Sequence, residues 1–159
     1  MKKTMLAICF MAMALTTVAN EQSAVEDKVQ VTAEVIQKLT ITTKPVDFGK
    51  VAQGSKNNAP TQKGKIEITG HKNERLLIQF ADGTDKVWKD KINDVKVSLS
   101  FGQEKEKLTY SPELDPELNQ PLALEDGQKT MGLTGKLDVP EAAKPGKYEG
   151  TLLVKVRYE

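Results

Sequence analysis

The sequence predicts an all-β fold built as a sandwich of two sheets, and three observations support this. Apolar and polar residues alternate in several short runs, which is the period of a strand with one buried face. Proline and glycine separate these runs. No apolar stripe of helical spacing extends over about ten residues, and the best helical candidate, residues 87–92, would make one turn. Several short strands spaced in this way are typical of an immunoglobulin-like β-sandwich.

The predicted strands can be placed in order along the chain. A hairpin or a crossing between the sheets is expected at residues 71–73, where polar residues separate two runs. Residues 103–130 are polar and contain prolines, so they are predicted to form long loops with one or two short strands. Residues 140–147 are rich in proline and glycine and predict a turn. The alternating runs are residues 26–41, 65–70, 76–80, 95–101, 133–139 and 148–158.

Residues 1–19 have the three parts of a secretory signal peptide. Two lysines precede an apolar core at about residues 6–15, and small residues follow it. Thr17 and Ala19 fit the small-x-small rule, so cleavage is expected after Ala19, with the bond after Ala24 as the alternative. The apolar core is shorter than the roughly 20 residues that a membrane-spanning helix needs, and no later segment is apolar enough to span.

The chain that remains after cleavage has the size of one domain, and its composition excludes several kinds of site. Cleavage removes Cys9, the only cysteine, which excludes a disulfide, a thiolate nucleophile and a cysteine metal site. Basic and acidic residues nearly balance. The protein therefore has no general electrostatic attraction for nucleic acid or for an anionic membrane surface.

The sequence offers little material for catalysis or metal binding. His71 is the only histidine and is predicted to be a solvated turn residue, and a zinc site would need several His or Cys ligands. The segment 49–55 lacks the Gly-Lys-Ser/Thr ending of a phosphate-binding loop. Acidic residues between 113 and 126 are spaced as a solvated face rather than as a calcium loop or a hydrolase pair. We expect no enzyme activity, no cofactor and no metal.

Both ends of the chain resemble known secreted domains. VEDKVQVTAEVIQKLTI, residues 25–41, is similar to the mature N-terminus of chaperone-usher pilins of the alternate class, the colonisation-factor fimbriae of enterobacteria, and Ala81 and Asp82 match an Ala-Asp pair of that class. VDFGKVAQG, at 46–54, and the ending LTGKLDVPEAAKPGKYEGTLLVKVRY, at 133–158, resemble a broader group of pilin-like and spore-coat-U-like domains of Gram-negative bacteria. The matches cover about half of the mature chain.

The resemblance implies an incomplete immunoglobulin-like sandwich that lacks its last strand. In such pilins a periplasmic chaperone, and then the N-terminal extension of the next subunit, supplies a strand to the open groove. It implies a donor-strand extension over residues 20–37, ending at Gln37, and a pilin domain over residues 38–159. The donor side chains would be Val29, Val31, Ala33 and Val35, and the C-terminal strand would present Leu152, Val154, Val156 and Tyr158 to the chaperone or the donor.

The function implied by the resemblance is that of a structural subunit of a surface fimbria that supports adhesion. Its partners would be neighbouring subunits, a periplasmic chaperone, an outer-membrane usher and a host receptor, and it would pass through the periplasm to the cell surface. Nucleic-acid binding and membrane insertion are not expected. An alternative remains open, in which residues 26–41 pair within a closed monomeric sandwich and the protein is a secreted or periplasmic binding module.

Overall fold

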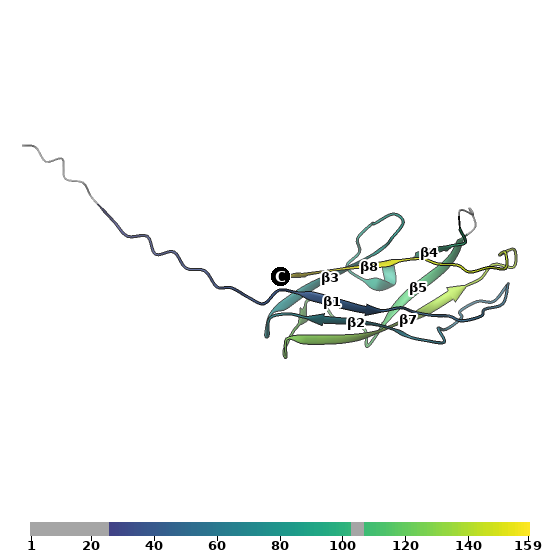
Figure 1. The fold of residues 1–159 in the computed structure, drawn as a ribbon, viewed down its shortest axis with the longest axis horizontal. Helices are drawn as coiled ribbons and strands as arrows, with labels where there is room; N and C mark the ends of the chain where they lie inside the picture. Colours follow the sequence, from purple (N-terminus) through teal and green to yellow (C-terminus); the bar gives the residue numbers. More distant parts are fainter. Residues whose placement is uncertain (1–25, 103–106) are drawn as a thin grey trace, which may run out of the picture. The chain divides into compact units, whose positions relative to one another are not determined.

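A computed structural model of the chain describes residues 26–102 and 107–159, so the predicted leader at residues 1–19 lies outside the described part. The all-β prediction is confirmed, because the chain folds into two antiparallel sheets (Figure 1). In spatial order, the larger sheet contains β1 (Thr40–Lys44), β2 (Gly64–Thr69), β7 (Gln128–Asp138), β5 (Lys107–Asp115) and β4 (Val97–Ser100), and the smaller sheet contains β6 (Leu122–Ala123), β3 (Arg75–Asp82) and β8 (Leu152–Tyr158).

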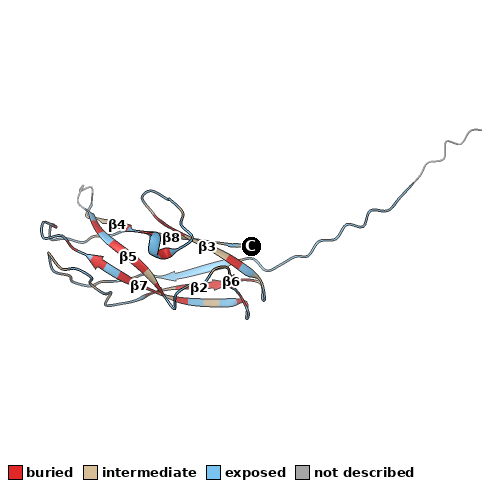
Figure 2. Cartoon of the chain, turned by 180° about the vertical axis from the view of Figure 1, so that it is seen from behind, coloured by how far each residue is buried: buried red, intermediate tan, exposed pale blue. Residues whose placement is uncertain are grey.

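The inward-facing residues of the two sheets form one apolar core, which is the arrangement of a β-sandwich. Ile66 and Ile68 of β2 face this core, and so do Ile78 and Phe80 of β3. These four side chains are at most 1% exposed. Figure 2 shows the buried positions alternating with less buried ones along β5 and β7. Burial of each large apolar side chain contributes about 1.5–3 kcal/mol, so this core is the main source of the domain's stability.

The loop after β2 carries the chain from one sheet to the other. β2 pairs with β1 and β7, whereas β3 pairs with β6 and β8. Of the two predicted alternatives at residues 71–73, the structure therefore has the crossing. Asn73 makes the reversal with a φ of 64°, a left-handed conformation that asparagine tolerates better than most residues.

Residues 103–130 contain more strand than the sequence predicts, because β5 is nine residues long. Pro112 lies within β5, and proline is normally confined to strand edges because it has no N–H to donate. The pairing of β4 with β5 ends at Tyr110, so Pro112 lies beyond the end of β4, where its missing donor breaks no ladder. The only helical turn among the described residues is η1 (Ile92–Asp94), which overlaps the predicted candidate at 87–92 only at Ile92.

The long alternating run at the N-terminus forms a strand only at its end. Residues 26–39 have no regular secondary structure, and β1 begins at Thr40. Leu39, an apolar residue of this run, packs against the core. Ile41 belongs to the same alternating run, whose apolar face is predicted to be buried, but it is 39% exposed. β1 is an edge strand that is exposed along its whole length. The alternating sequence therefore forms a strand here, but the apolar residues within that strand are not buried.

Candidate functional site

β1 and β8 each have one free edge. Among the described residues, β1 pairs only with β2, and β8 pairs only with β3. Each strand therefore has a row of backbone N–H and C=O groups without a ladder partner. In Figure 1 the two strands lie near each other, one from each sheet. Free edges of this kind are templates for pairing with an added strand.

A hollow of about 330 Å³ lies between the end of β1 and the start of β8, and we refer to it as the groove. Val46 and Phe48 line the β1 side, and Leu152 and Val154 line the β8 side. This volume is about twice that of an apolar cavity that can hold a benzene molecule. Side chains of the larger sheet form the rest of the lining, among them Ile66, Val97, Leu99, Tyr110 and Leu133.

The four residues predicted on the C-terminal strand lie together on one face of β8. All four are half-buried and pack against the core. The four predicted donor residues lie instead on the segment without secondary structure. Val29, Val31 and Val35 are 87–93% exposed, and Ala33 is also exposed. The β8 set is Leu152, Val154, Val156 and Tyr158.

Tyr110 anchors the floor of the groove. Its hydroxyl donates a hydrogen bond to the Thr134 carbonyl over 2.5 Å, and its ring meets Phe48 edge-on with the centroids 5.4 Å apart. Burial raises the pKa of Tyr110 far above its usual value, and the nearby charge of Glu113 raises it further. The phenol is therefore neutral at physiological pH and serves as a hydrogen-bond donor.

Tyr158 lies at the far end of β8 and joins that strand to the residues before β1. Its hydroxyl donates to the Gln37 carbonyl over 2.5 Å and accepts from the His71 backbone N–H over 2.8 Å. A contact therefore bridges the two strands at this end, whereas the hollow separates them at the Leu152 end. From here on, the groove means the whole strip between the free edges of β1 and β8, with its open end at the hollow beside Leu152 and its closed end at the Tyr158 bridge.

His71 lies beside the turn between β2 and β3, as predicted, but it is less solvated than expected. His71 is half-buried, its N–H bonds Tyr158, and its Nδ1 faces the Gln37 N–H at 3.4 Å. The sequence predicts Gln37 only as the last residue of the extension, with no role in a contact. The bridge joins residues 121 positions apart in the sequence, so no local pattern could have indicated it.

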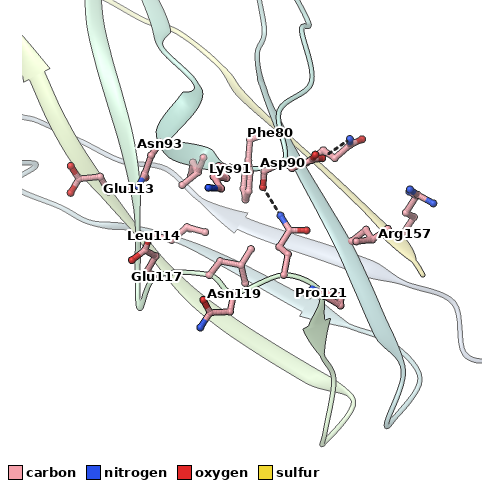
Figure 3. A pocket seen from close by; sticks show the side chains of 15 residues that line it. Phe80, Asp90, Lys91, Asn93, Glu113, Leu114, Glu117, Asn119, Pro121 and Arg157 are labelled. Carbon is pink, nitrogen blue, oxygen red and sulfur yellow. Dashed lines mark hydrogen bonds between the residues drawn. The ribbon is translucent and has the colours of Figure 1, made fainter.

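A second hollow, of about 790 Å³, lies beside β3 between the loops at residues 90–93 and 117–121 (Figure 3). Gln120 organises its wall, because its amide bonds both the N–H and the C=O of Ile78 and also the carbonyl of Asp90. Carboxylates, amides and cations line this hollow together with apolar side chains. The lining therefore does not indicate one chemical class of ligand.

Within residues 26–102 and 107–159, no group of three or more His, Cys, Asp or Glu side chains could hold a metal ion. No helix in the same ranges is long and apolar enough to cross a membrane.

No protein-family model matches the chain, and a search of curated proteins found no significant match.

Proposed function

We propose that the chain is a structural subunit of a surface fimbria, assembled when each subunit receives a strand from its neighbour. The observation that supports this most strongly is the groove, which has a free strand edge on either side and half-buried apolar residues along β8. These are the features expected of an immunoglobulin-like sandwich that lacks its last strand. Strand addition would satisfy the free backbone groups and cover the apolar residues.

The segment at residues 26–36 has the composition and length that a donor strand requires. Val29, Val31, Ala33 and Val35 alternate with polar residues, so they would all enter the groove from one face of an extended chain. About eleven extended residues span about 36 Å, whereas the seven residues of β8 span about 23 Å. Burial of three valines and an alanine would contribute roughly 5–8 kcal/mol, and each backbone hydrogen bond at most about 1 kcal/mol more.

The two ends of the groove favour one direction for the donor strand. β8 runs from the open end at Leu152 to the closed end at Tyr158, and the subunit's own extension leaves the domain at the closed end, beside Gln37. A donor antiparallel to β8 would have its own domain at the open end, so subunits would follow one another head to tail. A parallel donor would bring its domain to the closed end, where the extension of the receiving subunit also leaves, so the two would compete for the same space.

The same groove explains the partners that we propose. A periplasmic chaperone would lend a strand to the groove after export, and an outer-membrane usher would exchange it for the extension of the next subunit. The contact surface for the chaperone would be the half-buried face of β8, including Tyr158. The finished fibre would lie at the cell surface and support adhesion to a host receptor. This role is structural and requires no catalysis.

Unboiled gel electrophoresis of the full mature chain tests the proposal. We expect a ladder of multimers that collapses to monomer on boiling. Val31→Arg should abolish the ladder, because it would place a charge in the groove. Thr32→Arg is the matched control and should leave the ladder intact, because residue 32 lies on the opposite face of the extended segment. A wild-type chain that remains monomeric at every concentration would favour the closed binding module instead.

A further inference from the structure

The root of the N-terminal extension is residues 35–39, which belong to the compact unit Val35–Glu159. We infer that the Tyr158 hydroxyl is a positioning group that holds this root at the closed end of the groove. The contact thereby keeps the extension from turning back into its own groove. The contact between Tyr158 and the root does not depend on the proposed function, whereas its consequence for assembly rests on that function.

The root is held at its backbone. The Tyr158 hydroxyl uses both of its hydrogen-bonding functions, donating to the Gln37 carbonyl and accepting from the His71 N–H. The Gln37 N–H is directed at the His71 Nδ1 from the other side. Gln37 itself is exposed, so its side chain plays no part in this arrangement. The sequence requirement therefore falls on Tyr158 rather than on Gln37.

Packing below the backbone adds a second hold on the root. The side chain of Leu39 packs against the core, in a space that exists because residue 70 is glycine. A Cβ at Gly70 would lie 2.7 Å from Leu39 Cδ2 and 2.8 Å from Tyr158 Oη, which is too close for either. Gly70 thus allows the leucine and the tyrosine to approach the same point. Residues on both sides of Lys38 are therefore held in place.

This arrangement opposes insertion of the extension into its own groove. To enter that groove, the chain would have to form a hairpin with β1 and reverse within the root. Tight hairpin turns need residues with positive φ, usually Gly, Asn or Asp. Residues 36–39 are Ile-Gln-Lys-Leu, and none of the described residues with positive φ lies in the root. A wider turn would remove Val35 and Ala33 from the donor face, which would weaken the insertion.

Trypsin cleavage of the full mature chain after Lys38 measures the hold on the root. The protease can act there only when Gln37 and Leu39 leave their contacts, so cleavage reports how often the root opens. Tyr158→Phe removes one hydroxyl, and the rate at Lys38 should rise about fivefold relative to the rate at Lys86 in an exposed loop. The matched control is Tyr148→Phe, which loses a hydroxyl that donates to the Lys144 carbonyl over 3.0 Å. An equal rate at Lys38 in both variants would overturn the inference.

Refolding of the same chains at one fixed concentration measures the consequence for assembly. Tyr158→Phe should raise the fraction of monomer at the expense of multimer, because its extension can reach its own groove, and Tyr148→Phe should behave as the wild type. If the two variants assemble alike, the tyrosine does not direct the extension. If the wild type forms no multimers, the proposed function fails, while the cleavage ratio at Lys38 still decides whether Tyr158 holds the root.

Discussion

β3 and β8 are neighbours in one sheet and have nearly the same alternating sequence, yet they differ in burial. Ile78 and Phe80 of β3 pair directly with Val156 and Val154 of β8. The two β3 side chains are 0% exposed, whereas the two β8 side chains are only half-buried. On the side of β3 away from β8, the Gln120 amide bonds Ile78 and a backbone bridge joins Phe80 to Lys89, whereas β8 pairs on a single side among the described strands. Alternation therefore indicates which face of a strand is inward, but not whether other parts of the chain cover its edge.

The largest expected effect is the loss of stability when a core side chain of β3 is truncated, compared with its paired side chain on β8. In the chain shortened to begin at Ile36, Phe80→Ala should lower the free energy of unfolding by about 3–5 kcal/mol, because it opens a cavity in a filled core. Val154→Ala, at the paired position on β8, should cost less than about 1 kcal/mol, because the valine already faces the groove. Urea denaturation of both variants gives the two values. Equal costs would mean that β8 is as well covered as β3.

Filling the groove should bring the stability cost of Val154→Ala closer to that of Phe80→Ala. With a saturating peptide of residues 25–36, Val154→Ala in the shortened chain should cost about 1–2 kcal/mol, because the side chain would then be buried on both sides. The cost of Phe80→Ala should not change. Urea denaturation with and without the peptide measures both effects. If the cost of Val154→Ala is the same in both conditions, the peptide does not cover β8.

Alkaline pH should weaken the floor of the groove. The pKa of Tyr110 is raised in the folded state, so below about pH 10 both states are protonated and the phenol contributes its full stability. Above about pH 10 the unfolded chain loses this proton while the folded chain keeps it, so the free energy of unfolding should fall by up to about 1.4 kcal/mol per pH unit. Tyr110→Phe should reduce this slope. The free energy of unfolding can be measured by urea denaturation between pH 9 and 11. If Tyr110→Phe leaves its slope against pH unchanged, Tyr110 is not the group responsible.

The smallest effect is expected on the outer surface. Lys63 and Asp115 form an ion pair with the charged groups 3.0 Å apart, and their side chains are 60% and 63% exposed. Lys63→Ala should therefore change the free energy of unfolding by less than about 0.5 kcal/mol in low salt. The same urea assay applies, and a loss above 1 kcal/mol would show that the exposed pair matters more than the groove positions tested above.

The sequence predicted the parts of the fold that depend on local periodicity. The inward residues of β2, β3 and β7 follow from alternation alone, as does the inward face of β8. β5 was underestimated, because Pro112 interrupts its pattern, and only the position of the end of β4 explains why a proline is tolerated there. The role of His71 was missed for a similar reason, since it depends on a contact with a tyrosine near the other end of the chain. The groove itself depends on the strand order of two sheets, which periodicity does not report.

The most direct test of the account is the melting temperature of the chain that begins at Ile36, measured with and without a peptide of residues 25–36. A strand that fills the groove should raise the melting temperature by more than about 10 °C at saturation, since several kcal/mol of binding would be added to the folded state. A peptide with Val31→Arg should give no rise, and one with Thr32→Arg should match the parent peptide. A domain that melts at the same temperature with and without the parent peptide would contradict the account.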